Sequence, residues 1–115
     1  MAQKKALVVK KPWGNFTQFT HNEKTTVKII TVNKGGVLSL QSHRKRKELW
    51  VALDDGLTAT IKGKSTMLRK GGMLIVPLGA KHRLAASKKA RLLEISFGKF
   101  DEKDIIRYED KYGRV

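Results

Sequence analysis

Hydrophobic residues recur at every second position through most of the chain, which is the period of a β-strand with one buried face. The segments that show this period are rich in Val, Ile, Leu and Thr, which favour strands. They are TTVKIITV (25–32), VLSLQSH (37–43), LTATIKG (57–63), MLIVPL (73–78) and RLLEISF (91–97). Glycines between them indicate turns at intervals of roughly 10 residues. The pattern predicts an all-β barrel or sandwich that forms a single domain over residues 1–115.

The tail of the chain departs from this period. Acidic and apolar residues mix over 101–112 without strict alternation. Such a mixture permits helical structure, and we expect a short helical turn from Glu102 to Arg107.

Polar and leucine side chains alternate over residues 37–43. Ser39, Gln41 and His43 should therefore share one face of a strand, and Leu38 and Leu40 the other. In a small barrel the polar face can line a ligand cavity, and the leucine face then needs a cover. Either another strand of the chain or a second copy of the chain would supply it, and of the two we expect the second copy, in a homodimer.

The chain is strongly basic, with 25 Lys and Arg residues against ten acids and a net charge of +15. Such a surface attracts phosphorylated small molecules, nucleic acid or anionic lipid, and the charge alone does not choose among them. A specific nucleic-acid partner is not expected, because no recognition motif accompanies the charge. No apolar run approaches the ~18 residues of a membrane span, and the amino terminus lacks the apolar core of a signal peptide. We therefore expect a cytoplasmic protein with no membrane partner.

Four side chains form a candidate metal site. The chain has no cysteine, so a metal would need histidine, carboxylate or amide ligands. Alternation directs Gln41 and His43 to the same face, Glu48 opens the next strand after a turn, and His82 follows the loop PLGAK. Two imidazoles, a carboxylate and an amide oxygen suit Zn²⁺, Fe²⁺, Mn²⁺ or Ni²⁺ and leave positions open for a substrate. The third histidine, His21, matches no such pattern and is expected at the surface.

The spacing of these residues resembles the two motifs of the cupin superfamily. From Gly35 the sequence reads G-GVLSL-Q-S-H-RKRK-E, which is similar to the first motif with Gln41 in place of its first histidine. From Gly71 it continues to PLG and then His82, which is similar to the second motif. The closing Asn of that motif is replaced by Ala86. The resemblance implies a cupin double-stranded β-helix, also called a jelly-roll barrel.

Within that superfamily the chain resembles the type II phosphomannose isomerase domain. The segments that carry this likeness include KPWGNF, RKELW, IVPLGAKHRL, LLEISFG and the closing DIIRYEDKYGR. The domain usually follows a mannose-1-phosphate guanylyltransferase domain and also occurs alone, and we expect the stand-alone form here. The resemblance implies reversible conversion of mannose 6-phosphate to fructose 6-phosphate with one divalent metal ion, Zn²⁺ first, with Mn, Co, Fe or Ni as alternatives.

The same resemblance suggests roles for individual residues. The implied metal ligands are Gln41, His43, Glu48 and His82. Catalytic roles are implied for Glu94, Arg107 and Arg46, with Glu94 as the base that removes the proton next to the carbonyl. The substrate phosphate is expected to contact Arg46, Arg107, Arg114 and Lys45. The family commonly has histidines where this chain has Arg44, Lys45 and Leu49.

Other readings of these residues remain open. Glu94 can be a buried glutamate balanced by the metal or an arginine, and Arg107 and Arg114 can form ion pairs with Glu109 and Asp110 that fix the tail. A non-catalytic cupin that binds a sugar phosphate or nucleotide sugar would use the same metal site. Two histidines and one carboxylate are also the ligands of Fe²⁺ oxygenases.

Overall fold

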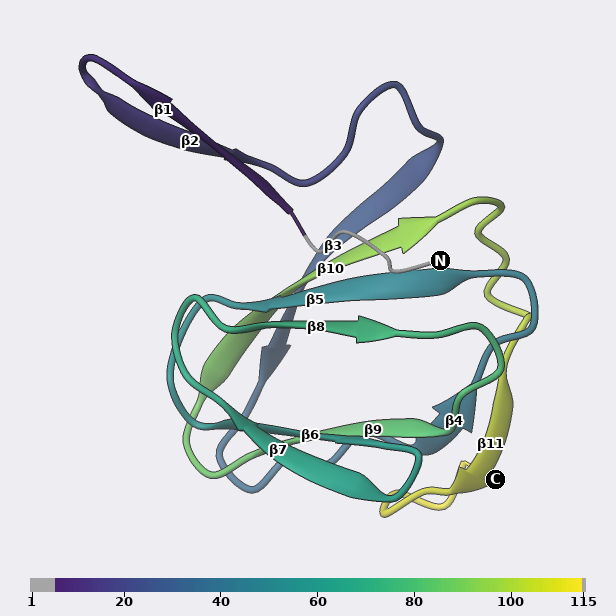
Figure 1. Cartoon of the computed structure of the whole chain (residues 1–115). Helices are drawn as coiled ribbons and strands as arrows, with labels where there is room; N and C mark the ends of the chain where they lie inside the picture. Colours follow the sequence, from purple (N-terminus) through teal and green to yellow (C-terminus); the bar gives the residue numbers. More distant parts are fainter. Residues whose placement is uncertain (1–5, 115) are drawn as a thin grey trace.

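The computed structural model describes residues 6–114, and every regular element within them is a β-strand (Figure 1). The strands are β1 (Leu7–Lys11), β2 (Gly14–Gln18), β3 (Thr25–Val32), β4 (Leu40–Ser42), β5 (Lys47–Ala52), β6 (Leu57–Ile61), β7 (Lys64–Leu68), β8 (Met73–Val76), β9 (His82–Ala86), β10 (Ala90–Phe97) and β11 (Ile106–Glu109). The predicted all-β fold is confirmed. No helix long and apolar enough to cross a membrane occurs in this part of the chain.

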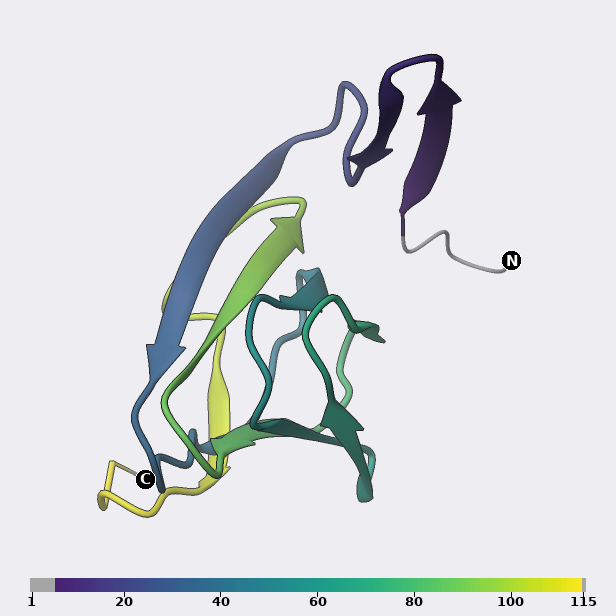
Figure 2. The ribbon, with the colours of Figure 1, turned by 90° about the vertical axis from the view of Figure 1, so that its left-hand side faces the viewer.

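Two antiparallel sheets face each other and enclose the core (Figures 1 and 2). One has the strand order β3-β10-β5-β8, and the other has the order β11-β4-β9-β6-β7. The hairpin of β1 and β2 stands away from both sheets. Lys62 and Gly63 join β6 to β7 with φ angles of 52° and 79°, as a two-residue hairpin loop with positive φ at both positions requires.

The four-stranded sheet presents successive rows of side chains to the interior. One row across the strands joins Thr26, Ser96, Glu48 and Val76. The next row joins Lys28, Glu94, Trp50 and Leu74. The following row, with Ile30, Leu92 and Ala52, is wholly apolar. Leu92 packs with Leu57 and Leu84 of the opposite sheet. The interior therefore has a polar end and an apolar end.

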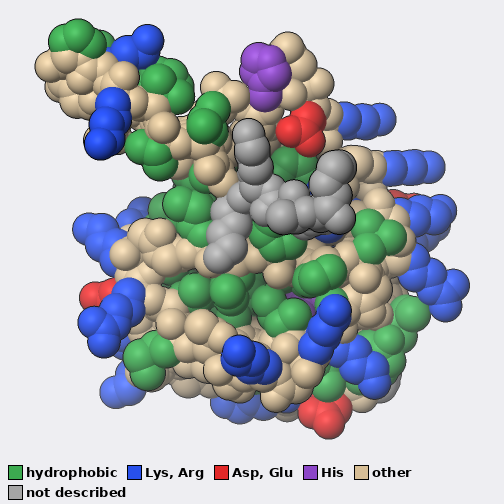
Figure 3. Space-filling model, viewed as in Figure 1, with side chains coloured by type: hydrophobic (Ala, Val, Ile, Leu, Met, Phe, Trp, Pro, Cys, Tyr) green, Lys and Arg blue, Asp and Glu red, His purple; other side chains and the backbone are tan. Residues whose placement is uncertain are grey.

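The outer face of the same sheet is apolar as well. Leu49, Val51 and Ile95 form a second buried cluster there, with Leu93 and Met73 packed against it. On the neighbouring strand β3, Val27 and Ile29 are 57% and 60% exposed. Lys and Arg side chains are spread around the molecule rather than gathered in one patch of the view in Figure 3. This sheet therefore carries uncovered apolar surface at its β3 edge.

The helical turn predicted from Glu102 to Arg107 is wrong. Residues 102–103 form a turn, and residues from Ile106 onward form β11, which pairs with β4. The backbone groups of β4 would otherwise lie unpaired at a sheet edge, and pairing with them outweighs the weak local preference of the tail.

The alternation predicted over residues 37–43 holds for its second half only. Val37 bridges Ala85, whereas Gln41 is opposite His82, so four residues advance on one strand against three on the other. Such an extra residue is a β-bulge, and it reverses the facing of the side chains before it. Leu38 accordingly packs against the interior core instead of an outer leucine face. The homodimer was predicted from an outer face that carries both Leu38 and Leu40, and Leu38 does not lie on such a face.

Candidate metal centre

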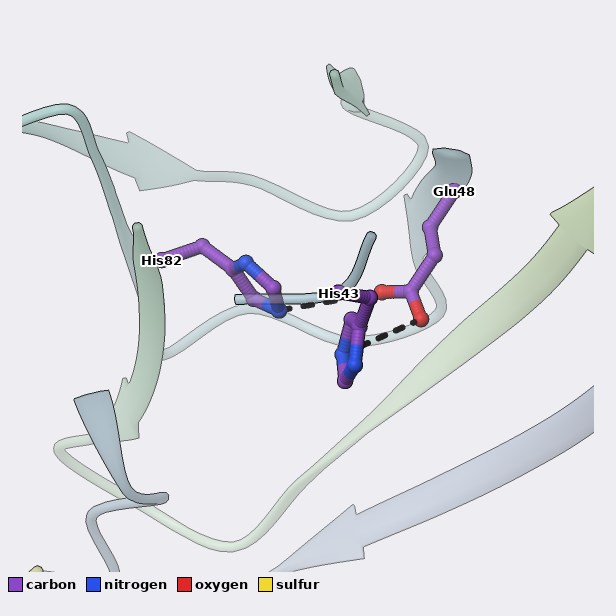
Figure 4. A group of neighbouring side chains, drawn as sticks. All are labelled: His43, Glu48 and His82. Carbon is purple, nitrogen blue, oxygen red and sulfur yellow. Dashed lines mark ion pairs between the residues drawn. The ribbon is translucent and has the colours of Figure 1, made fainter. Parts of the chain in front are cut away.

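His43, Glu48 and His82 point toward one another at the polar end of the interior (Figure 4). One ligand atom from each lies within 4.8 Å of the others. The Nε2 atom of His43 is 3.7 Å from Glu48 Oε2, and the Nε2 atom of His82 is 4.0 Å from Glu48 Oε1. All three side chains are at most 4% exposed. The structure thus brings together three of the four predicted metal ligands.

Pairing between strands positions these side chains. His43 directly follows β4, and His82 begins β9, where it lies in the same sheet as β4 and opposite Gln41. Glu48 comes from β5 in the other sheet and is opposite Ser96 of β10. The site is therefore held between the two sheets.

Backbone carbonyls fix the tautomers of both histidines. His43 donates from Nδ1 to the carbonyl of Asp104 at 2.7 Å, and His82 donates from Nδ1 to the carbonyl of Ala80 at 2.9 Å. A neutral imidazole with its proton on Nδ1 keeps the lone pair on Nε2. Both lone pairs therefore face Glu48. Metal-binding histidines commonly have such a second hydrogen bond, so these residues fit a divalent cation.

The charges of the three groups also suit a cation. Burial lowers the pKa of His43 and of His82, so both imidazoles are neutral at neutral pH. Burial acts to raise the pKa of Glu48, but the neighbouring histidines and the hydrogen bonds with Glu94 and Arg46 leave it below its ordinary value. Two neutral imidazoles and a carboxylate are a donor set that Zn²⁺ and Fe²⁺ accept.

Gln41, the fourth predicted ligand, lies on the same face of the sheet as His82. Its Nε2 donates to Ser39 Oγ at 3.0 Å. Because this contact uses the amide nitrogen, the amide oxygen is the atom left to face other partners.

Arg46 and Glu94 border the three ligands. Arg46 is 7% exposed and donates from Nε to Glu48 Oε2 at 3.1 Å, from Nη1 to the Asp101 carbonyl at 3.1 Å and from Nη2 to His43 Nε2 at 3.2 Å. Glu94 is 8% exposed, and burial together with the neighbouring Glu48 raises its pKa to about 8. The Glu94 carboxyl is thus a proton-carrying group beside the ligands.

The other predicted phosphate-binding residues lie at the surface. Lys45 is exposed, and its backbone N–H donates to Asp104 Oδ2 at 2.9 Å. Arg107 is an exposed residue of β11, opposite Gln41. Arg114 pairs with Asp110, 2.8 Å from Nε to Oδ2, and lines a hollow with residues 31–33 and 36–38. The ion pair considered for Arg114 is therefore present, whereas Glu109 pairs with Arg83.

Several residues of the centre had little or no signal in the sequence. Trp50 donates from Nε1 to Glu48 Oε1 at 3.0 Å, and its position two residues after Glu48 could have indicated this contact. The backbone carbonyl of Asp104 accepts the hydrogen bond from His43. Its carboxylate accepts hydrogen bonds from the backbone N–H groups of Arg44 and Lys45. No residue pattern shows which backbone carbonyl will meet a histidine.

Comparison with known proteins identifies relatives of this chain. The model of the family described as mannose-6-phosphate isomerase C-terminal matches residues 2–110. Mannose-1-phosphate guanylyltransferase ManC of Salmonella typhimurium is 38% identical over 110 residues, 93% of this chain and 23% of the relative. The alginate biosynthesis protein AlgA of Pseudomonas aeruginosa is 36% identical over the same shares. The chain thus spans about a quarter of the length of these curated relatives.

The fold is also found among solved structures. An RmlC-like cupin from Shewanella frigidimarina aligns with a TM-score of 0.63 at 13% identity, over 78% of this chain and 76% of that one. At this identity the likeness concerns the fold alone, and it confirms the predicted cupin barrel. The family match over nearly the whole chain shows that the protein, which has this cupin fold, belongs to the mannose-6-phosphate isomerase C-terminal family.

Proposed function

We propose that this chain is a metal-dependent isomerase that interconverts mannose 6-phosphate and fructose 6-phosphate. The observation that carries the proposal is the buried group of His43, Glu48 and His82, with the Glu94 carboxyl, whose pKa is raised to about 8, beside it. Family membership supports this choice of substrate among the reactions that a cupin metal site can serve.

His43, Glu48, His82 and the amide oxygen of Gln41 would hold one divalent ion, with Zn²⁺ as the first choice. Such an ion would supply Lewis-acid chemistry, since its positive charge would stabilise negative charge on the sugar oxygens. In its ionised form, Glu94 would take the proton from C2 of mannose 6-phosphate, and the carboxyl that is then protonated would return it to C1. Arg46 orients Glu48 through the hydrogen bond from its Nε.

The phosphate of the substrate is assigned to the basic residues around the site. Arg46 lies inside it, and Lys45 belongs to the same loop between β4 and β5. Arg107 shares the inner face with Gln41 and His82, because the three residues are opposite one another across β11, β4 and β9. Arg114 lines the hollow formed with residues 31–33 and 36–38, and none of the three ligands lines that hollow.

A second candidate function is a cupin that binds a sugar phosphate or nucleotide sugar without turnover. The observation in its favour is that Arg44 and Lys45, at two positions where the family commonly has histidines, are exposed in the loop beside the ligands. Leu49, the third such position, lies in the outer apolar cluster and not in the site. The substitutions therefore affect the rim of the site rather than its three buried ligands.

Isomerase activity of the Zn²⁺-, Mn²⁺- and Co²⁺-loaded protein on mannose 6-phosphate tests the proposal. We expect fructose 6-phosphate to form, and we expect a His43→Ala, His82→Ala double variant to lose both the metal and the activity. Binding of mannose 6-phosphate without turnover would favour the second function, and full metal content in the double variant would overturn the ligand assignment.

We also propose a cellular setting for this chain. Relatives named for alginate biosynthesis and for mannose-1-phosphate guanylyltransferase suggest a cytoplasmic role in supplying sugars for polysaccharides. We also propose a homodimer, now on the basis of the apolar surface at Val27 and Ile29 instead of the leucine face.

A further inference from the structure

Lys28 is a cation on the inner face of the four-stranded sheet. It lies on β3, opposite Glu94 of β10, and Glu94 is in turn opposite Trp50 of β5. The Lys28 side chain therefore belongs to the row next to that of Glu48. An inward-facing lysine is uncommon in a barrel core, because burying an ammonium group without a partner is costly.

Phe100 brings Lys28 close to a second cation. The Nζ atom of Lys28 lies 4.0 Å from the centroid of the Phe100 ring, and Cζ of Arg46 lies 4.3 Å from the same centroid. Each cation is attracted to the ring, but the two positive charges repel each other. An anion beside them would remove this repulsion.

The two cations differ in how their hydrogen-bond donors are used. Arg46 directs Nε, Nη1 and Nη2 to Glu48, the Asp101 carbonyl and His43. Within residues 6–114, Lys28 Nζ makes no hydrogen bond or ion pair that meets the usual distance limits, and its contact is with the Phe100 ring. Lys28 is therefore the interior cation whose three N–H donors are available to a ligand.

We propose that Lys28, supported by the Phe100 ring, binds the phosphoryl group of the substrate and selects phosphorylated over neutral sugars. The identity of the ligand as a sugar phosphate rests on the proposed function. A compact ammonium group binds phosphate as a point charge and donates charge-assisted hydrogen bonds. Partial burial strengthens that attraction relative to the exposed Lys45 and Arg107, whose charges are screened by water and salt.

Calorimetric titration of the Zn²⁺-loaded protein tests the assignment, with mannose 6-phosphate, inorganic phosphate and mannose as probes. We compare the wild type with Lys28→Met, Lys28→Arg and Lys34→Met. The last variant removes the same charge from an exposed loop at the apolar end of the barrel. We expect Lys28→Met to weaken binding of mannose 6-phosphate and phosphate about 10-fold or more, the contribution of a hydrogen bond to a charged group. Lys28→Arg should retain most of the affinity, and Lys34→Met all of it.

The outcomes separate this inference from the isomerase proposal. Equal affinity of Lys28→Met and Lys34→Met for mannose 6-phosphate would overturn the role of Lys28, whatever the turnover. Wild-type affinity for mannose equal to that for mannose 6-phosphate would overturn it too. Weakened binding in Lys28→Met, with unchanged zinc content, would support it even in a protein that does not turn the sugar over. If Lys28→Met does not fold, as judged by circular dichroism, Lys28→Gln takes its place.

Discussion

Replacing Arg46 by Met should destabilise the metal-free protein and tighten its binding of zinc. Arg46 is nearly buried, and its guanidinium contacts both Glu48 and His43. Removing one partner of a buried ion pair costs about 3–5 kcal/mol in the free energy of unfolding, because the other charge stays buried without compensation. We therefore expect the metal-free variant to be less stable by about 3 kcal/mol.

The zinc-loaded variant should lose less stability. The Nη2 donor of Arg46 lies 3.2 Å from His43 Nε2, so the hydrogen bond and a metal ion compete for the same lone pair. A hydrogen bond from a charged donor contributes about 1.5–3 kcal/mol, and its loss makes zinc binding roughly 10-fold tighter or more. Binding and stability are linked, so the loss of unfolding free energy in the metal-free protein must exceed the loss in the zinc-loaded protein by the gain in zinc-binding free energy.

Denaturant unfolding with and without zinc, together with zinc titration against a competing chelator, measures both effects. Arg44→Met is the matched control, because Arg44 is an exposed cation of the same loop. It should change neither quantity by more than about 0.5 kcal/mol. Arg46→Met with unchanged stability and unchanged or weaker zinc binding would refute the competition at His43.

Three further predictions concern other parts of the molecule. Glu94→Gln should lower kcat about 100-fold at unchanged zinc content, and full activity would exclude Glu94 as the proton-transfer group. The pKa of the Asp110 carboxyl should be about 2, because Arg114 stabilises its charged form. The pair therefore stabilises the fold above the ordinary value of 3.8 and stops doing so as the pH falls through 2, whereas a carbon-13 NMR midpoint near 3.8 would contradict the pairing. Ile29→Lys should give a monomer in sedimentation, and a monomeric wild type at the same concentration would rule out the proposed homodimer.

Periodicity and motif spacing predicted much of this structure. The segment 25–32 forms β3 with the predicted ends, because its alternation matches a sheet with one face toward the core. The grouping of His43, Glu48 and His82 was predictable, because side chains alternate between the two faces of a strand and sequence spacing therefore indicates which residues face the interior together. Both inferences rest on local patterns that the tertiary structure leaves intact.

Other features depend on partners that are distant in sequence. The bulge that turns Leu38 inward arises between β4 and β9, and nothing within residues 37–43 marks it. The tail becomes a strand because β4 offers an unpaired edge. The carbonyl of Asp104 reaches His43 from 61 residues away. Such contacts require knowledge of the assembled fold.

The division of the interior into two ends separates the demands of folding from those of chemistry. A substitution in the rows of Glu48 or Glu94 changes reactive groups, while the apolar rows around Leu92 and Leu84 go on holding the sheets together. Natural variation can therefore exchange one ligand or base for another without first finding a new core. Proteins that share this barrel can therefore evolve different reactions while they keep the same fold.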